Sequence, residues 1–313
     1  MRAEPAIDVR GISKKFALHT AVSRLSFSVA PNEIFGLVGP DGAGKTTTMR
    51  MLAGVLRPNN GAVFIDGVNV INEPELAKTR FSYMPQRFGL YDDLTVDENI
   101  RFYSDIFGIP DKLREERTTR LLAASDMGQF RRRLAGQLSG GMKQKLGLTC
   151  ALIHTPKIVL LDEPTTGVDP VSRRDFWRIL YDLREEGVTI VISTAYLDEA
   201  ERCHRLALLY EGELLECDTP QALKRHMPGA ILSVVSKNSR GIRDVLGRCE
   251  GVLNTMLVGD SVHIVVDDAE RRLSPIEKAL TASGLPFETP VRTAPTIEDL
   301  SVTLQKPRKD AAA

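Results

Sequence analysis

Long apolar segments are missing from this chain. The longest apolar runs, such as residues 206–210, fall far short of the ~20 residues that a membrane-spanning helix needs. The first residues do not have the character of a secretory signal peptide. We therefore expect any membrane role of this chain to depend on another polypeptide.

Cysteines are few, and the positive and negative charges balance. The four cysteines are scattered without C-x-x-C spacing, which is typical of reduced thiols in a cytosol and argues against a disulfide or zinc framework. Lysine and arginine together number 41, and so do aspartate and glutamate, so the chain has no net charge. Because nucleic acids attract proteins largely through positive charge, we expect no nucleic-acid partner.

The rest of the composition is typical of a globular protein with about two domains. The length of 313 residues favours that number, and a hydrophobic fraction of 42% is enough to form a sizeable core. In the first part of the chain, short β-rich runs alternate with helical patterns, as in an α/β fold. The predicted strands of this part cover residues 7–9, 25–29, 34–38, 158–161, 188–193 and 206–210.

These elements predict a layered first domain over residues 1–228. The first two strands indicate an antiparallel layer, and the strand at 34–38 is followed by a predicted helix at 45–53. Residues 95–153 show mainly helical periodicity. The pattern therefore predicts a helical subdomain at about 87–150, inserted beside a mostly parallel core sheet.

The pattern changes after Pro228 and Gly229, and residues 229–305 are predicted to form a second unit. Its elements follow the order β-α-β-β-α-β of a small α+β ferredoxin-like domain. They are strand 231–236, helix 240–249, strands 252–258 and 261–267, helix 274–283 and strand 287–292. Because this unit shows no catalytic constellation, we assign it a regulatory or assembly role, and we interpret residues 306–313 as a frayed tail.

A glycine-rich segment after the predicted strand at 34–38 has the spacing of a phosphate-binding loop. It matches G-x-x-x-x-G-K-[ST], in which backbone amides surround phosphates, the lysine neutralises charge and the hydroxyl holds magnesium. The loop and the first helical residues are Gly39, Pro40, Asp41, Gly42, Ala43, Gly44, Lys45, Thr46 and Thr47. The order of strand, loop and helix is the one that nucleotide binding requires.

A strand that ends in two acids completes the expected phosphate chemistry. Asp162 ends the apolar run at 158–161, which places its carboxylate at the C-terminal edge of the sheet, near the magnesium. Glu163 follows as the general base for water. The alternative is an acidic pair on the surface.

The segment Leu138–Met142 has the sequence LSGGM and precedes a helical pattern. The amides of Ser139, Gly140 and Gly141 are therefore expected at a helix N-terminus, which suits a phosphate. With this segment between the phosphate loop and Asp162, the sequence resembles the ATP-binding cassette (ABC) ATPases over roughly residues 5–227. These proteins are the motor subunits of ABC transporters.

The resemblance implies cofactors and partners. In that family two cassettes close head to tail, and each ATP lies between the phosphate loop of one chain and LSGG of the other. ATP, magnesium, a second cassette and a separate membrane permease are thereby implied, with a peripheral location on the cytoplasmic face of the cell membrane. The small second unit is similar to those of exporter ATPases, including drug and antibiotic exporters.

Three further residues receive roles from the resemblance. Gln86 matches the Q-loop glutamine that touches magnesium or the attacking water, Phe16 matches an adenine-stacking aromatic residue that is usually tyrosine, and Asp169 matches a D-loop aspartate that communicates across the dimer. The alternatives are an ordinary turn glutamine, a core phenylalanine and a helix cap before Pro170, and for Asp169 both roles can hold.

One position departs from the family. A switch histidine that contacts the γ-phosphate normally follows the strand predicted at 188–193, whereas this chain has Ala195. Losing one donor aimed at transition-state charge typically costs about 10² to 10³ in rate. His154 and His204 are not expected to replace it, since one precedes the strand at 158–161 and the other lies beyond the next helix.

Three functions remain to be compared. The first is an ATP-hydrolysing exporter subunit, preferably paired with a different cassette as in tandem-ATPase exporters, whose first cassette also departs at the switch position, although a homodimer is possible. The second is a regulatory nucleotide-binding subunit that barely hydrolyses ATP. Intact Glu163 argues against the second, and Ala195 argues for it. The third, a soluble ABC protein acting on ribosomes or DNA, is disfavoured by the single cassette and zero net charge.

Overall fold

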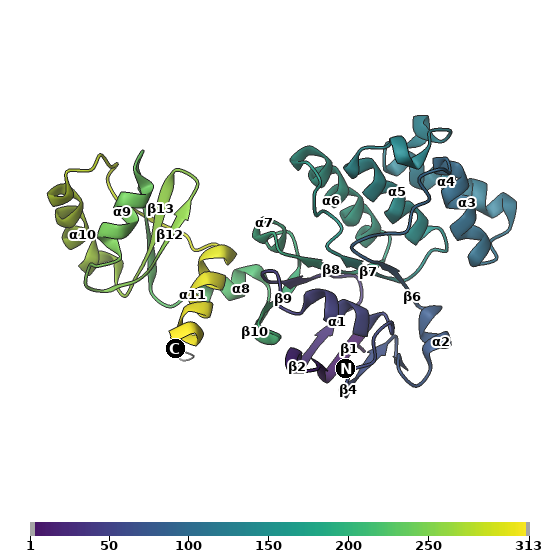
Figure 1. Cartoon of the computed structure of the whole chain (residues 1–313), viewed down its shortest axis with the longest axis horizontal. Helices are drawn as coiled ribbons and strands as arrows, with labels where there is room; N and C mark the ends of the chain where they lie inside the picture. The colour runs from purple at the N-terminus through teal and green to yellow at the C-terminus, as the bar shows by residue number, and fades with distance from the viewer. Residues whose placement is uncertain (1–3, 311–313) are drawn as a thin grey trace. The chain divides into compact units, whose positions relative to one another are not determined.

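A computed structural model of the chain describes residues 4–310 and the side chains of residues 4–305. The chain forms two compact units, residues 1–217 and 218–313. Figure 1 labels the elements of both units. None of the helices in the described range is long and apolar enough to cross a membrane.

The first unit contains the predicted parallel core sheet. Its strand order is β10-β9-β3-β8-β7-β6, and the five strands from β9 to β6 are parallel to their neighbours. The strands are β3 (Ile34–Val38), β6 (Phe81–Met84), β7 (Ile158–Asp162), β8 (Thr189–Thr194), β9 (Arg205–Tyr210) and β10 (Glu213–Asp218). Strands β3, β7 and β8 are buried along their whole length, which explains their almost continuous apolar sequence.

The predicted antiparallel layer is a second sheet in the same unit. Its order is β2-β1-β4-β5, in antiparallel register. The strands are β1 (Ile7–Phe16), β2 (His19–Val29), β4 (Asn60–Ile65) and β5 (Val68–Asn69). Both β1 and β2 are longer than the sequence runs suggested.

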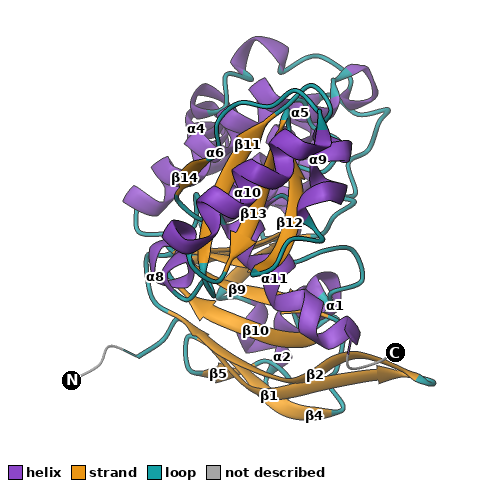
Figure 2. Cartoon of the chain, turned by 90° about the vertical axis from the view of Figure 1, so that its left-hand side faces the viewer, coloured by secondary structure: helices purple, strands orange, loops and turns teal. Residues whose placement is uncertain are grey.

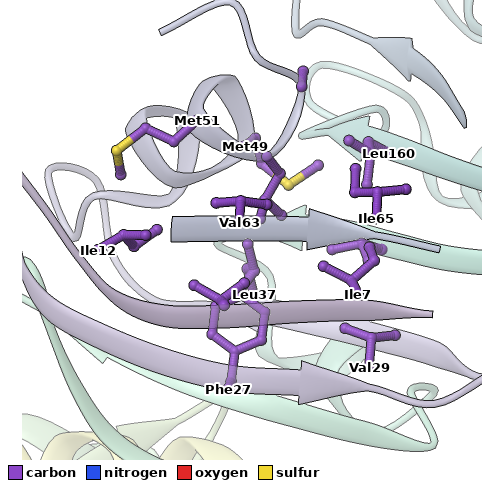
Figure 3. Packing of buried hydrophobic residues seen from close by; sticks show 14 of the residues in the cluster. Ile7, Ile12, Phe27, Val29, Leu37, Met49, Met51, Val63, Ile65 and Leu160 are labelled. Atoms are coloured by element: carbon purple, nitrogen blue, oxygen red, sulfur yellow. The ribbon is translucent and has the colours of Figure 1, made fainter. Parts of the chain in front are cut away.

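Helix α1 (Lys45–Leu52) packs between the two sheets. Met49 from this helix is fully buried in a cluster with Ile7 and Val63 of the antiparallel sheet and Leu160 of the parallel sheet (Figure 3). Each such side chain contributes roughly 1.5–3 kcal/mol on burial. This apolar contact fixes the beginning of α1, and hence the phosphate loop, relative to the end of β7.

The remaining helices of the first unit include three in the region where a helical subdomain is predicted. Helices α3, α4 and α5 lie together in Figure 1, as the periodicity of residues 95–153 predicted. Thr95 and Glu98 form a capping box at the start of α3. The helices are α2 (Pro74–Lys78), α3 (Val96–Ile106), α4 (Asp111–Ala124), α5 (Gly140–Leu152), α6 (Pro170–Glu185) and α7 (Leu197–Ala200), with 3-10 turns at Gly128–Phe130 and Ala135–Gln137.

The second unit has the predicted β-α-β-β-α-β order. Its antiparallel sheet has the strand order β12-β13-β11-β14, and helices α9 and α10 cover one face of it (Figure 2). The elements are β11 (Ala230–Val235), α9 (Ser239–Leu246), β12 (Val252–Val258), β13 (Ser261–Val266), α10 (Ala269–Ser283) and β14 (Val291–Thr293).

The structure corrects both ends of this unit. It begins at Asp218 rather than at residue 229, because helix α8 (Pro220–Arg225) packs against helix α11 (Ile297–Asp310). Helix α11 continues through residues 306–310, which the sequence analysis assigned to a tail, and residues 311–313 lie outside the described residues. A buried contact of 2.9 Å between His263 Nδ1 and Asp299 Oδ1 joins β13 to α11.

Candidate nucleotide-binding site

The phosphate loop connects the end of β3 to the start of α1, as its sequence predicted. Gly44 has φ +94°, and a Cβ there would lie 2.5 Å from the carbonyl oxygen of Ala21. A Cβ at Gly39 would lie 2.3 Å from the carbonyl oxygen of Leu209. Both positions therefore require glycine. No side chain caps α1, whose N-terminal residue is preceded by Gly44, so its first amides remain suited to phosphate oxygens.

Lys45 is held inside this loop. Its side chain is only 4% exposed, and Nζ donates to the carbonyl oxygens of Gly39 at 2.9 Å and Pro40 at 3.0 Å. Nζ also forms an ion pair of 3.1 Å with Oε1 of Glu163. The predicted phosphate-binding cation and the predicted general base thus contact each other directly.

Asp162 lies at the end of β7, where the sequence analysis placed it. Its side chain is 1% exposed, and Oδ1 accepts hydrogen bonds from Ser193 Oγ at 2.7 Å and Thr46 Oγ1 at 3.1 Å. Oδ2 accepts a bond of 3.3 Å from the Tyr83 hydroxyl. Burial raises the pKa of Asp162 in spite of these three donors, and burial with the neighbouring carboxylate raises the pKa of Tyr83. The burial of Asp162 does not fit a surface acidic pair.

Glu163 adopts a left-handed backbone conformation with φ +48°, which is uncommon outside glycine. Its N–H donates to Ser193 Oγ at 2.9 Å. Its Oε2 accepts a bond of 2.9 Å from Nε2 of Gln86. Gln86 and the candidate base Glu163 are therefore in contact. This contact favours the Q-loop interpretation of Gln86 over an ordinary turn glutamine.

These groups surround a cavity of about 360 Å³. Gln86, Lys45 and Glu163 line it on the phosphate side, with Asp41 and the loop residues beside them. Phe16 also lines the cavity, is 47% exposed and is therefore not a core residue. The full lining is Phe16, His19, Ala21, Asp41, Gly42, Gly44, Lys45, Thr46, Thr47, Gln86 and Glu163.

The donors present fit magnesium bound together with phosphates. Mg²⁺ is usually held by one or two carboxylates plus waters and substrate phosphates. Thr46 Oγ1 and Asp162 Oδ1, 3.1 Å apart, form such an incomplete set of hard oxygen donors. Among the described side chains, residues 4–305, no group of three or more His, Cys, Asp or Glu residues could hold a metal ion by itself. A metal at this site would therefore need ligands beyond these side chains.

The LSGG residues do not line this cavity. Ser139 is the N-cap of α5, and its Oγ accepts the N–H of Met142 at 3.3 Å. Ser139 and Gly140 are exposed, whereas Gly141 is buried. A Cβ at Gly141 would come within 2.5 Å of the Cβ of Ser172 on α6, so this glycine permits close packing of α5 on α6.

Asp169 caps α6, as one of its two interpretations predicted. Its Oδ1 accepts the N–H of Val171 at 3.1 Å and that of Ser172 at 3.0 Å. Hydrogen bonding to the Ser172 side chain, together with these backbone bonds, lowers the pKa of Asp169. Pro170 occupies the first position of the helix. Communication across a dimer stays a prediction for this residue.

Ala195 is exposed between β8 and α7 and offers no side-chain donor. His154 stacks on Phe107 with ring centroids 3.9 Å apart, and burial lowers its pKa. His204 Nδ1 accepts the N–H of Ile34 at 3.2 Å. Neither histidine lines the cavity, in agreement with the expectation that neither replaces the switch histidine.

Sequence reasoning missed three residues near the site. Ser193 bonds both Asp162 and the N–H of Glu163, and the end of a strand parallel to β7 was the signal that could have identified it. Tyr83 had no comparable signal. His19 lines the cavity because it pairs with Phe16 across the β1–β2 turn.

Known proteins share this architecture. A family model described as ABC transporter matches residues 22–166. The chain is 42% identical over 306 residues to the probable multidrug ABC transporter ATP-binding protein YbhF of Escherichia coli (strain K12), a match that covers 96% of this chain and 52% of that protein. The chain thus spans about half the length of YbhF.

Two further proteins match this chain over most of their own length. The chain is 36% identical over 269 residues to the Nod factor export ATP-binding protein I of Paraburkholderia xenovorans (strain LB400), covering 85% of this chain and 88% of that protein. A solved dimeric structure of a bacterial ABC transporter cassette has 25% identity and a TM-score of 0.62, covering 68% of this chain and 98% of that one. The chain therefore belongs to the ABC transporter ATP-binding proteins.

Proposed function

We propose that this chain is the ATP-binding and ATP-hydrolysing subunit of an ABC-type exporter. The observation that carries the proposal is the contact between Lys45, Glu163 and Gln86 on the wall of a cavity that begins at the phosphate loop. Phosphoryl transfer needs phosphate donors, a metal site and a group that orients water. The three side chains, with Thr46 and Asp162, supply these parts.

The Lys45 ammonium, held by the carbonyl oxygens of Gly39 and Pro40, would neutralise phosphate charge when ATP binds. In the structure, Lys45 Nζ lies 3.1 Å from the Glu163 carboxylate. When ATP binds, phosphate oxygens would replace this carboxylate as the partner of Nζ. The freed carboxylate can then accept a proton from water, oriented with Gln86. Thr46 and Asp162 would hold magnesium, which would supply positive charge to the phosphates. ATP binding itself would therefore prepare the base.

Phe16 forms the opposite part of the proposed nucleotide site. Its half-exposed ring is available for stacking on adenine, and Lys14 Nζ lies 5.4 Å from the ring centroid. A stacked base contributes roughly 1–3 kcal/mol. Phenylalanine in place of the usual tyrosine keeps this stacking surface.

A second cassette would complete the site. Ser139 and Gly140 are exposed at the N-terminus of α5 and do not reach the cavity of their own chain. Their amides suit the phosphates of an ATP bound to another cassette. A solved cassette structure described as dimeric supports pairing of two cassettes. We prefer a heterodimer with a cassette that has a switch histidine, because Ala195 weakens this chain's own site.

Transport would be carried out by a separate membrane permease, with this chain at the cytoplasmic face of the membrane. The names of the relatives, multidrug transport and Nod factor export, support an exporter. The small second unit keeps its proposed regulatory or assembly role.

Magnesium-dependent ATP turnover of the purified chain, measured against protein concentration, tests this proposal. Turnover should rise with concentration and fall at least about 10²-fold in Glu163→Gln, since the base is lost. Glu75→Gln, which changes an exposed carboxylate on α2 outside the cavity wall, is the control and should retain activity. Turnover that is equal in Glu163→Gln and wild type would contradict the proposal.

Ala195 favours a second candidate, a regulatory subunit that binds ATP and closes on its partner but barely hydrolyses it. In that case ATP binding should persist at high affinity while wild type and Glu163→Gln turn over equally slowly. A mixture with the natural partner cassette would then owe its activity to the partner's own Glu. The two functions are thus separated by one pair of variants.

A further inference from the structure

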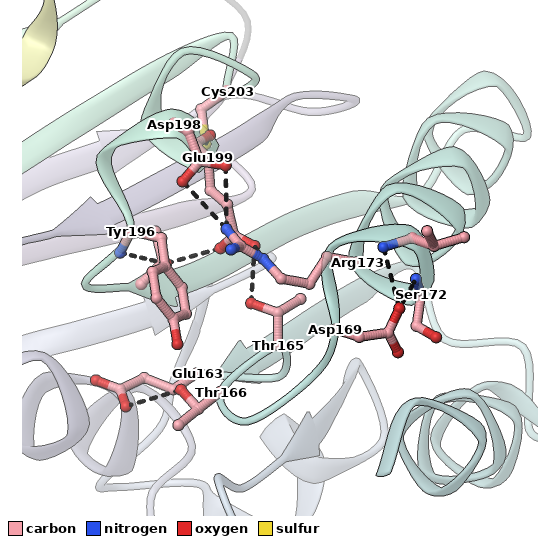
Figure 4. A network of polar contacts seen from close by, with 12 residues as sticks. Glu163, Thr165, Thr166, Asp169, Ser172, Arg173, Tyr196, Asp198, Glu199 and Cys203 are labelled. Carbon is pink, nitrogen blue, oxygen red and sulfur yellow. Dashed lines mark hydrogen bonds and ion pairs between the residues drawn. The ribbon is translucent and has the colours of Figure 1, made fainter. Parts of the chain in front are cut away.

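Glu199 is a buried carboxylate that takes no part in the cavity wall. It is 0% exposed and lies on α7, just after the short connection at residues 195–196, here called the Ala195 loop. Oε1 accepts bonds from Thr165 Oγ1 at 2.8 Å and Arg173 Nε at 3.2 Å (Figure 4). Oε2 accepts a bond from Thr194 Oγ1 at 2.7 Å. A buried carboxylate without such partners would be strongly unfavourable, so the three donors and Glu199 form one unit.

The three donors come from three segments next to the proposed catalytic groups. Thr165 follows Glu163 by two residues, and Thr194 directly follows Ser193, which bonds Asp162 and the N–H of Glu163. Arg173 lies in the first turn of α6. Glu199 therefore connects both ends of the loop at residues 163–169 to the end of β8.

Arg173 extends this connection to the Ala195 loop. Its Nη2 donates to both carboxylate oxygens of Asp198 at 3.1 Å, and its guanidinium carbon lies 4.1 Å from the centroid of the Tyr196 ring. The N–H of Tyr196 donates to Thr194 Oγ1 at 3.0 Å. Both neighbours of Ala195 are thus fixed, although Ala195 has no polar side chain of its own.

The backbone conformation of Glu163 needs surrounding contacts to maintain it, and this network supplies such contacts. Its φ of +48° is unfavourable for a residue with a Cβ and persists only where surrounding contacts impose it. We propose that Glu199 and Arg173 are positioning residues, which hold the loop at 163–169 so that the Glu163 carboxylate faces the cavity. The inference rests on the proposed ATPase function, and neither residue lines the cavity.

The central variant is Glu199→Gln, which keeps the size of the side chain and removes its charge. Arg173→Lys is a second variant, because lysine keeps the charge but lacks the planar group that binds Glu199 and Asp198 together. Asp175→Asn is the matched control, since Asp175 lies on the same helix and pairs at 3.4 Å with Lys145. That pair does not involve the loop at 163–169.

Amide hydrogen exchange of the full chain tests the positioning directly. The N–H groups of Glu163 and Thr166, which bond Ser193 and the Glu163 carbonyl, should exchange about tenfold faster in Glu199→Gln and in Arg173→Lys. They should be unchanged in Asp175→Asn. Unchanged exchange in the first two variants would overturn the inference.

Kinetics distinguish positioning from general stability. In Glu199→Gln, kcat should fall by up to about 10²-fold, because small displacements of a catalytic group are costly, while KM for ATP stays within about twofold. In a Glu163→Gln background, Glu199→Gln should cause no further fall in kcat. If Glu199 served only the general stability of the fold, the double variant would show the same fold-decrease in kcat that Glu199→Gln causes in the wild-type chain. A raised KM with unchanged kcat would also overturn the inference. If the wild-type chain binds ATP without turnover, the proposed hydrolysis fails, and the exchange experiment alone decides the positioning role.

Discussion

Ala195→His should restore the missing donor of the nucleotide site. Ala195 is exposed, and its neighbours Thr194 and Tyr196 are held by hydrogen bonds and by the Arg173 guanidinium. A larger side chain can therefore be placed there at little cost, within about 0.5 kcal/mol of stability. Lys45 and Gln86 line the nucleotide cavity, so the substitution would add one donor to the groups that this chain supplies.

One donor aimed at developing charge is worth about 10² to 10³ in kcat, or roughly 2.7–4 kcal/mol. We expect kcat of Ala195→His to rise by a factor in this range, measured as magnesium-dependent phosphate release over a range of ATP concentrations. Ala195→Phe is the control of similar size without a donor and should not increase kcat. Adding Glu163→Gln to Ala195→His should remove the gain. A properly folded Ala195→His chain with wild-type kcat would refute the reasoning, and would mean that hydrolysis here does not depend on this position.

Three further substitutions test other parts of the site. Asp162→Asn should abolish turnover yet raise Tm at pH 7, because burial raises the pKa of Asp162 in the folded state, so the ionised carboxylate destabilises the fold once the pH rises above that pKa. The gain in Tm should shrink as the pH falls toward 4, and a Tm lowered at pH 7 would contradict it. Phe16→Ala should weaken ATP binding by roughly 1–3 kcal/mol in calorimetry, with Leu18→Ala, 96% exposed in the adjoining turn, as an unchanged control. Gly44→Ala should prevent ATP binding, since its Cβ would lie 2.5 Å from the Ala21 carbonyl oxygen, and normal binding by this variant would show that the loop can relax.

The phosphate loop and the cassette fold could be predicted because their signals are local. Glycines at fixed spacing indicate the backbone conformation of the phosphate loop. The apolar runs of β3, β7 and β8 indicate strands that are buried on both faces. The family resemblance supplied the roles of Gln86 and Phe16, and the structure places both on the wall of one cavity.

Contacts between distant segments could not be read from the sequence. The ion pair of Lys45 with Glu163 depends on the packing of α1 between two sheets, which positions residues from different parts of the chain. The polar surroundings of Asp162 depend on the parallel register of β7 with β8, which sets Asp162 beside Ser193. The Glu199 network likewise has no spacing signal.

The second unit shows a similar limit. Its β-α-β-β-α-β order followed from periodicity, but its extent did not. Pro228 and Gly229 favoured a boundary there, whereas α8 belongs to the second unit through its packing on α11. Helix α11 was missed because its C-terminal part is polar and charged, which resembles a tail, while its buried Ile297 and Leu300 anchor it near its start.

Complementation between two inactive variants tests most directly whether the ATP site is shared between cassettes. Both variants carry Ala195→His so that the site is competent, and Lys45→Ala is then mixed with Ser139→Arg. If the phosphate loop of one chain works with the LSGG of the other, an equal mixture should regain about a quarter of the activity of Ala195→His, because half of the dimers contain one intact site of two. A mixture that remains as inactive as its components would contradict a composite site in pairs of this chain.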